Sequence, residues 1–302
     1  MTEKSALPKK TRELHSHHFD STIWNDLVFR DDDIIISTYG KSGTTWVQQI
    51  IGQLLFDGSP DLEVAEISPW LDLRVPPKEV KLPIVEEQTH RRFMKTHLPV
   101  DALRFSANAK YLYIGRDARD VVWSLYNHHS NANQTWYQAL NDTPGLVGPP
   151  IEPPPDDIRQ YWRDWFDRDG YPFWPFWENV RSWWAIRDLP NVNFIHFNHL
   201  KHDMPGEIRK IANFLEIPIQ ESSWGKILEH CSFDWMKNNA TKSVPLGGAF
   251  WDAGAQVFIN KGVNNRWKDT LSQEESAEYE KRAEAELGAE CARWLATGEE
   301  AD

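Results

Sequence analysis

Residues 31–56 read DDDIIISTYGKSGTTWVQQIIGQLLF, and they indicate the class of fold. The first part, 31–38, is a short run of β-branched apolar residues, which is typical of a buried strand in a parallel sheet. Gly40 and Gly43 then interrupt the run. From 44 to 56 apolar side chains recur at helical spacing, at positions 46, 47, 50, 51, 54 and 55. A strand, a glycine loop and a helix in this order form the first half of a βαβ unit.

The rest of the chain continues this alternation. Short apolar runs at 91–97, 110–115 and 192–197 predict three more strands. A helix is expected from Arg116, after the third strand, and the amphipathic stretch 206–217 predicts another. Such alternation favours an α/β fold with a central parallel β-sheet flanked by helices. Ligands of these sheets bind beyond the carboxyl ends of the strands, and we expect the site there.

The composition limits the classes of partner. The chain has 302 residues, of which 40% are hydrophobic, so it is long enough to bury a sizeable core. A net charge of -12 argues against a broad basic face, and we expect no nucleic-acid partner. The two cysteines form no disulfide framework, which fits a reducing compartment. We find no signal-peptide core and no apolar stretch of roughly 18 residues, so we predict a cytoplasmic protein without a membrane span.

We expect residues 1–302 to form a single domain with four distinct segments. The polar residues 1–30 are expected to wrap the surface. Residues 141–157 contain six prolines and predict a loop, more readily a lid than a plain cover. Residues 237–266 are rich in Asn, Gly and Lys and predict a mobile flap. A C-terminal helix is expected over 272–296, because Ser272 and Glu275 form a capping-box pattern at its start.

The glycine loop carries the residue types of an anion site. A helix N-terminus offers unpaired N–H groups and the positive end of the helix dipole, and glycines let a phosphate approach it. Lys41 adds a full charge, and Ser42, Thr44 and Thr45 add hydroxyl donors. An ordinary βα turn with a surface lysine is the plain alternative.

A Walker-type loop is a further alternative, and the residues argue against it. G-K-S at 40–42 matches the end of the Walker A pattern, but Ile35 stands where that pattern requires glycine. The metal-holding carboxylate of such an enzyme would have to be Asp117, and Arg116 intervenes. An NTP-dependent kinase is therefore the weaker hypothesis.

Four motifs resemble those of the cytosolic-type sulfotransferases, which use 3′-phosphoadenosine 5′-phosphosulfate (PAPS). They are the loop STYGKSGTTW at 37–46, Lys-Thr-His at 95–97, Arg116 with Ser124 eight residues on, and Lys-Gly with Trp-Lys after a four-residue gap within 260–271. Together they span most of the chain, in the family's order. The loop departs from the family at Gly40, where proline is common.

The resemblance implies the chemistry. It implies a P-loop-like phosphosulfate-binding loop and a metal-free, in-line transfer of the sulfuryl group from PAPS to an acceptor hydroxyl. The product is adenosine 3′,5′-bisphosphate (PAP). By resemblance, His97 removes the acceptor proton, Lys41 stabilises the bridging oxygen of the leaving group, and Lys95 contacts the sulfuryl oxygens. The residue types suit these roles, because the imidazole pKa lies near neutrality and the transfer needs proton removal and charge stabilisation.

The resemblance also implies the nucleotide contacts. The 5′-phosphate loop comprises Lys41, Ser42, Gly43, Thr44, Thr45 and Trp46, and the Trp46 ring offers a face to adenine. The 3′-phosphate contacts are Arg116, Ser124, Lys261 and Gly262, and the adenine side comprises Phe197, Ser232, Phe233 and Met236. Asn260 stands where the family usually has arginine, and Arg266 is expected to compensate. Phe197 aligns with a frequent tyrosine, whose hydroxyl bond it cannot make.

The acceptor is expected to be a small molecule with a hydroxyl. Aromatic enrichment favours a phenol, a steroid or another apolar alcohol. A non-catalytic nucleotide-binding module is a second alternative. The dimerisation motif of animal members would begin near Lys268 and is not matched, so the oligomeric state stays open.

Two further clusters are expected to be structural. The histidine-rich stretches 15–18 and 128–129 lack the spacing of metal ligands, and we expect no metal. The tryptophan-rich stretch 161–184 predicts helix packing, with some side chains free to line an acceptor pocket.

Overall fold

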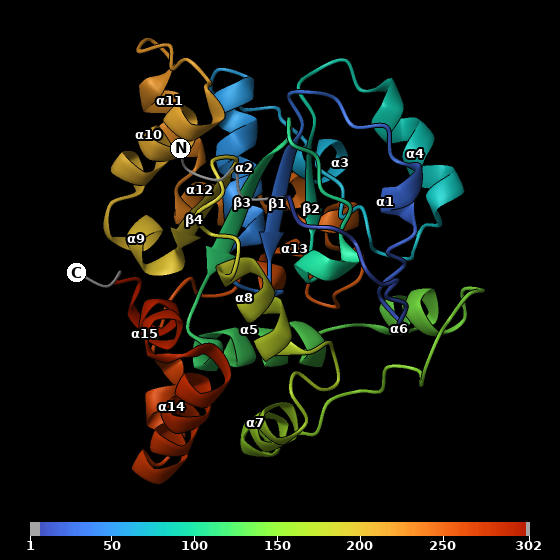
Figure 1. Ribbon diagram of the computed structural model, residues 1–302, viewed down its shortest axis with the longest axis vertical. Coiled ribbons are helices and arrows are strands. Elements are labelled where there is room, and N and C mark those ends of the chain that lie inside the picture. The colour runs from blue at the N-terminus through green and yellow to red at the C-terminus, as the bar shows by residue number, and fades with distance from the viewer. Residues whose placement is uncertain (1–6, 300–302) are drawn as a thin grey trace.

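The predicted first strand is the centre of a four-stranded parallel sheet. The computed structural model describes residues 7–299 and contains β1 (Ile34–Thr38), β2 (Phe93–Thr96), β3 (Lys110–Gly115) and β4 (Val192–His196). The strands lie in the order β2-β1-β3-β4, with Ile34 in register with Phe93 on one side and Lys110 on the other. The predicted α/β class, with helices around a parallel sheet, is confirmed (Figure 1).

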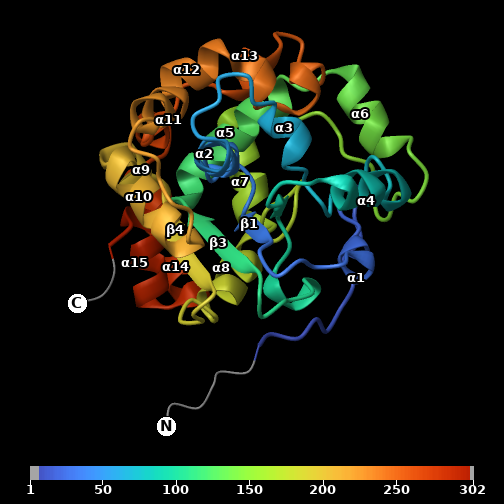
Figure 2. The same ribbon diagram turned by 90° about the horizontal axis from the view of Figure 1, so that it is seen from above.

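Alternating side chains of β1 build two cores. Ile34 and Ile36 face one apolar cluster, and Ile35 faces the other, because successive side chains of a strand point to opposite faces. The first cluster includes residues of α2 (Thr44–Leu55), α10 (Met204–Leu215) and α11 (Trp224–His230). The second includes residues of α5 (Ala118–Ser130), α7 (Ile158–Asp167), α8 (Phe176–Trp184), α14 (Gln273–Leu287) and α15 (Ala289–Thr297). Figure 2 shows α2 and α11 on one side of the sheet and α8 and α14 on the other.

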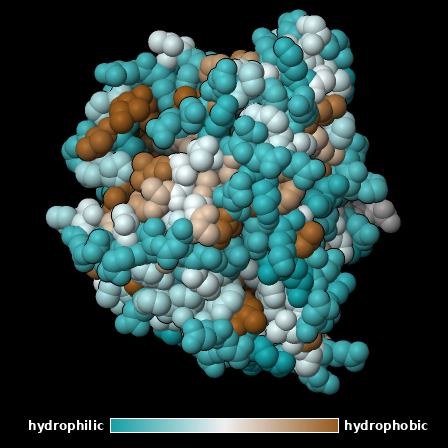
Figure 3. Space-filling view, turned by 180° about the vertical axis from the view of Figure 1, so that it is seen from behind, coloured by the Kyte–Doolittle hydropathy of each residue, from teal (hydrophilic) through white to brown (hydrophobic). Residues whose placement is uncertain are grey.

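The remaining helices are short and lie around this framework. They are α1 (Ile23–Asp26), α3 (Val64–Ile67), α4 (Lys78–Glu87), α6 (Gln134–Asn141), α9 (Phe197–His202), α12 (Phe233–Asn238) and α13 (Ala255–Phe258). On the face seen from behind, apolar side chains appear in separate groups on a mainly hydrophilic surface (Figure 3).

The C-terminal segment differs from the expected single helix. The capping box of Ser272 and Glu275 is present and starts α14. The chain breaks at Gly288, with φ 81° and ψ 158°, and α15 begins at Ala289. Glycine adopts this conformation without the steric cost that a side chain would add. The prediction of one continuous helix over 272–296 is therefore wrong, because two helices occupy this segment.

The N-terminal segment also differs from its prediction. Residues 1–6 lie outside the described range. In the rest of the segment, Phe19, Trp24 and Leu27 are fully buried in the larger core. The segment therefore contributes to the interior as well as to the surface.

The proline-rich segment and residues 237–266 contain little regular secondary structure. Beyond α6 the proline-rich residues 142–157 form no helix or strand, as predicted. Arg74 holds this loop, since its Nη1 donates to the carbonyl oxygens of Thr143 and Pro144 at 2.9 Å each. Residues 237–266 form short helical turns, including α13. Whether the first is a lid and the second a mobile flap stays a prediction.

Candidate active site

The loop between β1 and α2 has the backbone of an anion cradle. Lys41 has φ 69° and Gly43 has φ 119°, both in the left-handed region. Residues other than glycine adopt the left-handed conformation at a cost of roughly 1–2 kcal/mol. Such strained residues cluster at functional sites. A Cβ at Gly43 would also lie 3.0 Å from the Phe197 ring. The loop leads into the N-terminus of α2, whose first N–H groups point away from the helix body.

Gly40, the departure from the family pattern, has a packing reason. A Cβ at this position would lie 3.2 Å from the Trp174 ring, closer than ordinary van der Waals contact. Trp174 in turn stacks on the His97 ring, with a centroid distance of 5.5 Å and an interplanar angle of 22°. Gly40 therefore leaves room for the indole against which His97 packs.

A cavity of about 490 Å³ opens at the carboxyl ends of the strands. Sixteen of the seventeen predicted site residues line it: Lys41, Gly43, Thr44, Thr45, Trp46, Lys95, His97, Arg116, Ser124, Phe197, Ser232, Phe233, Met236, Lys261, Gly262 and Arg266. Ser42 is 2% exposed and is not among the lining residues. The fold thus gathers segments from all four strand ends and from the 237–266 segment around one space.

Three cations meet inside this cavity with little solvent around them. Burial, together with the charges of Lys95 and Arg116, lowers the pKa of Lys41 to about 7. Burial lowers the pKa of Lys95 to about 8, although Asp72 opposes the shift. The Lys41 ammonium lies 3.8 Å from the centroid of the Phe258 ring, in a cation–π contact. Asp72, Asp117 and Asp120 offset these positive charges only in part, because the pKa values of the three cations stay lowered, so the cluster favours an anionic ligand.

One ring nitrogen of His97 is engaged by the backbone, and the other is left free by the residues that the structure describes. His97 is 5% exposed, and its Nδ1 lies 2.6 Å from the carbonyl oxygen of Thr38. A carbonyl only accepts hydrogen bonds, so Nδ1 carries the proton and Nε2 carries the lone pair. Burial and the charges of Lys95 and Lys41 lower the pKa of His97 to about 3, which keeps the ring neutral.

Sequence reasoning missed the residues that hold His97. Trp70 meets the imidazole edge-on, with ring centroids 4.6 Å apart, and the Asp72 carboxylate accepts from the backbone N–H of His97 at 3.4 Å. Asp72 also accepts from the indole of Trp70 at 2.9 Å. Trp70 and Asp72 belong to no recognisable sequence motif. The only hint in the sequence was the tryptophan-rich stretch, which contains Trp174.

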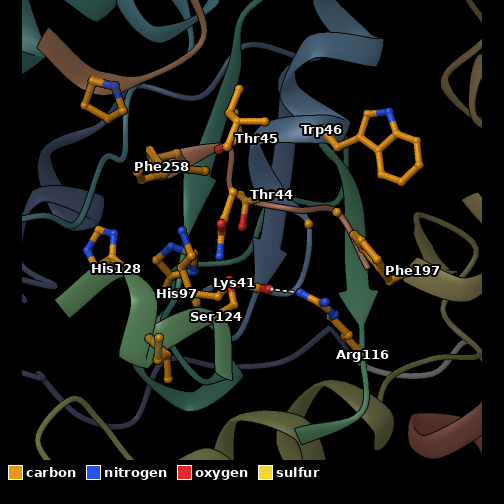
Figure 4. Close-up of a pocket in the computed structure, with 18 of the residues that line it drawn as sticks. Lys41, Thr44, Thr45, Trp46, His97, Arg116, Ser124, His128, Phe197 and Phe258 are labelled. Carbon is orange, nitrogen blue, oxygen red and sulfur yellow. Dashed lines mark hydrogen bonds between the residues drawn. The ribbon is translucent and has the colours of Figure 1, made fainter. Parts of the chain in front are cut away.

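Arg116 lies on the opposite side of Lys41 from His97 (Figure 4). Its Nη1 donates to the Lys41 carbonyl oxygen at 3.1 Å (Figure 4), and its Nη2 donates to Oδ1 of Asn264 at 2.8 Å. Its guanidinium lies 4.2 Å from the centroid of the Phe197 ring. Asp120 ties the same loop down by accepting from the Asn265 N–H at 2.6 Å. The late Lys-Gly segment is therefore held against Arg116.

Aromatic side chains border the space beside the loop. Trp46 and Phe197 meet at a centroid distance of 5.6 Å and an angle of 70°. The Trp46 indole is fixed because its Nε1 donates to the Cys231 carbonyl oxygen at 2.8 Å. A Cβ at Gly262 would lie 2.7 Å from the Phe233 ring, so glycine is required for this approach. Figure 4 shows Trp46 and Phe197 on one side of Lys41, and His97, His128 and Phe258 on the other.

The side that contains His97 is a second, mostly aromatic chamber. Its remaining lining includes His18, Trp70, Leu73, Val75, His128, Trp136, Leu140, Phe173, Trp174, Phe250 and Trp251. The tryptophan-rich stretch divides as predicted: Trp162, Trp165, Trp177 and Trp183 are buried in the core, whereas Phe173 and Trp174 reach the chamber. The cavity thus joins a cationic half to an apolar half, with Lys41, Lys95 and His97 between them.

The described part of the chain contains neither a metal-binding cluster nor a helix suited to span a membrane. Within residues 7–299 no group of three or more His, Cys, Asp or Glu side chains is arranged to hold a metal ion. In the same range, no helix has the length and apolar character needed to cross a bilayer.

Comparison with known proteins agrees with this geometry. Residues 31–290 match the sulfotransferase domain. The chain is 29% identical to a glycolipid sulfotransferase of Mycobacterium bovis, over 86% of each chain. It is 30% identical to sulfotransferase 1B1 of Canis lupus familiaris, over 91% of this chain and 93% of that one.

Solved structures share the fold. Mouse sulfotransferase SULT7A1 complexed with PAP has a TM-score of 0.68 at 23% identity, over 91% of this chain and 92% of that one. Retinol dehydratase with androsterone and PAP has a TM-score of 0.67 at 24% identity, over 89% and 84%.

The donor set of the cavity fits a nucleotide with phosphates at both ends. Lys41 and the α2 N-terminus lie at one end, Arg116 and the late Lys-Gly segment at the other, and aromatic rings border the space beside them. The cosubstrate is PAPS and the product is PAP. The chain is an enzyme and belongs to the PAPS-dependent sulfotransferase family.

Proposed function

We propose that the enzyme transfers the sulfuryl group of PAPS to a hydroxyl of a small apolar or aromatic acceptor, with His97 as general base. The observation that carries this proposal is the bond from His97 Nδ1 to the Thr38 carbonyl. It leaves Nε2 as a proton acceptor on the wall where the cationic and apolar halves of the cavity meet. Family membership leaves no support for the kinase and the non-catalytic alternatives.

The chain's own residues divide the work of the transfer. When bound, PAPS supplies the sulfuryl group, and its leaving group is PAP. Nε2 of His97 accepts the proton of the acceptor hydroxyl, which makes the oxygen a better nucleophile. The Lys41 ammonium stabilises the negative charge that grows on the bridging oxygen, and Lys95 offsets charge on the sulfuryl oxygens. An anionic nucleotide also offsets the lysine charges that hold the pKa of His97 low, and so raises its basicity.

The acceptor class is supported by the chamber lining. Tryptophan, phenylalanine and leucine side chains dominate the surface around His97, and such surfaces bind apolar bodies through the area they bury. Retinol dehydratase, which shares the fold, is solved with androsterone and with retinol. We therefore place phenols, steroids and other apolar alcohols first in the acceptor class.

The test is a sulfation assay over a panel of phenols, apolar alcohols and charged sugars, with PAPS as donor. The proposal predicts sulfated products from the apolar hydroxyl compounds and little from the sugars. Calorimetry should show tighter binding of PAPS than of ATP. Preferential sulfation of the sugars would contradict the acceptor assignment while leaving the enzyme class intact.

We also propose that the protein is located in the cytoplasm. Cys231 and Cys291 are buried and unpaired, which suits the reducing cytoplasm.

The pH dependence of PAP binding follows from the two lysines. Their pKa values of about 7 and about 8 in the free enzyme mean that both lose charge as the pH rises. A bound anion favours the charged ammonium, so binding takes up protons at neutral and mildly alkaline pH. We expect the PAP affinity to fall by more than about tenfold from about pH 7 to about pH 8.5.

Calorimetry in buffers of different ionisation enthalpy measures both the affinity and the protons taken up. Lys41→Arg is the matched variant, because arginine stays charged throughout this range, and it should lose part of the dependence. A constant PAP affinity across the range would contradict the lowered lysine pKa values.

Arg266 is expected to replace the missing arginine at position 260. It lines the cavity, and its charge adds to the burial that lowers the pKa of Arg116, so the two side chains lie near each other. One charge-assisted bond to a phosphate corresponds to roughly tenfold in affinity or more. Arg266→Ala should therefore weaken PAP binding by about tenfold, and Asn260→Ala should have an effect of less than about twofold. The reverse order in calorimetry would show that Asn260 carries the contact.

A further inference from the structure

Two histidines of the acceptor chamber have no part in the transfer described above. His18 comes from the N-terminal segment, and His128 lies on α5, four residues beyond Ser124. Both line the cavity. His18 packs on the same two indoles as His97, with ring centroids 5.8 Å from Trp70 and 5.6 Å from Trp174. The two histidines therefore line the part of the cavity in which the acceptor hydroxyl would meet His97.

The protonation of His18 follows from its neighbours. Nε2 of His17 lies 2.9 Å from the carbonyl oxygen of Pro172, which can only accept, so this nitrogen carries the proton. Burial lowers the pKa of His17, so the ring is neutral and its Nδ1 has a lone pair. That lone pair accepts from Nδ1 of His18. The chain of bonds leaves Nε2 of His18 as a hydrogen-bond acceptor.

This acceptor has no donor among the residues that the structure describes. Among residues 7–299, Nε2 of His18 makes no hydrogen bond, and neither nitrogen of His128 does. His18 is 3% exposed and surrounded by the rings of Trp70, Trp136, Phe173 and Trp174. The His18 side chain is nearly buried, yet Nε2 is not among the fully enclosed atoms, so it is accessible from the cavity that His18 lines. Polar atoms of buried side chains normally form hydrogen bonds, and a donor on a molecule inside the chamber would complete the bonding of this one.

We infer that the acceptor is a diol or bisphenol whose second hydroxyl donates a hydrogen bond to Nε2 of His18 while the first is sulfated at His97. The inference rests on the proposed function and narrows its acceptor class. Aromatic walls hold the apolar body, and His18 selects compounds with a second O–H group. A site built to bind a hydroxyl discriminates strongly against an analogue that lacks it, because its own polar atom is then left unpaired.

The experiment compares bisphenols with their monomethyl ethers. The series runs from resorcinol to 4,4′-biphenol, so that the separation of the two oxygens varies. Methylation of one oxygen keeps the apolar body and removes one O–H donor. For at least one separation, the wild-type kcat/KM should be higher for the bisphenol by about tenfold or more.

Two variants show whether His18 is responsible. His18→Phe keeps an aromatic ring among aromatic neighbours and removes the acceptor atom, so the preference should fall to about one. His18→Gln returns an acceptor oxygen near the position of Nε2 and should restore part of the preference. PAP affinity should stay unchanged in both variants, and calorimetry with PAP verifies that they fold.

The outcomes are distinct. A wild-type ratio near one for every pair overturns the inference, as does an undiminished ratio in His18→Phe. If His18→Phe fails to fold, the wild-type ratios and His18→Gln still decide. Absence of transfer to every member of the series, with PAP still bound, overturns the proposed function and this inference with it.

Discussion

His97→Ala is expected to lower kcat by a factor of about 10²–10⁴, the usual contribution of a positioned general base. The variant loses the one imidazole whose Nε2 is left free by the Thr38 bond at the edge of the cationic half. The loop, Lys41 and Arg116 stay in place, so PAP affinity should change by less than about threefold. Steady-state sulfation assays and PAP calorimetry on the same preparation measure both quantities.

The control is His202→Ala, which removes an exposed imidazole of α9 that is not among the residues lining the cavity. It should leave kcat and PAP affinity unchanged. Full activity of His97→Ala would remove the base assignment. Loss of PAP binding together with turnover would instead indicate that His97 maintains the shape of the site.

Lys41→Ala should weaken both PAP binding and catalysis. The lysine belongs to the loop at the α2 N-terminus and has no carboxylate partner among residues 7–299, so its charge is available to a ligand. Loss of one charge-assisted bond corresponds to roughly 10–100-fold in affinity. Loss of a group that stabilises transition-state charge corresponds to roughly 10²–10³-fold in kcat. The combined fall in kcat/KM should therefore exceed about 10³.

Two further lysine variants locate the effect. Lys226→Ala removes an exposed lysine of α11 and should behave like the wild type. Lys41→Arg keeps the charge in a different shape, so PAP binding should recover more than kcat. A Lys41→Ala enzyme with normal kcat at saturating PAPS would restrict Lys41 to nucleotide binding.

The strand–loop–helix unit could be predicted because its signals are local. A β-branched run, two glycines and a helical repeat lie within residues 31–56, and the structure contains β1 and α2 there. The order β2-β1-β3-β4 could not be predicted, because strand pairing joins segments far apart in the chain. The break at Gly288 was missed because the flanking charged residues favour a helix on both sides.

The cationic half of the site could be predicted from motifs, and its aromatic half could not. The side chains Lys41, Lys95, His97 and Arg116 lie at or just beyond the carboxyl ends of strands. These ends meet at one edge of the sheet, so the side chains converge in such a fold. The walls of the chamber come from Trp70, Trp174 and the N-terminal segment, whose positions depend on tertiary packing. For this reason the stretches 15–18 and 128–129 gave no functional signal, although His18 and His128 line the cavity.

A crystal structure of the enzyme with PAP and a sulfatable phenol would be the most direct test of His97 as the general base. The distance to measure joins Nε2 of His97 to the phenol oxygen. We expect this distance to lie within hydrogen-bond reach, about 2.6–3.2 Å, and the Lys41 ammonium to lie at the 5′-phosphate of PAP. A phenol oxygen bound out of reach of His97, or a 5′-phosphate distant from the loop at 41–46, would contradict this expectation.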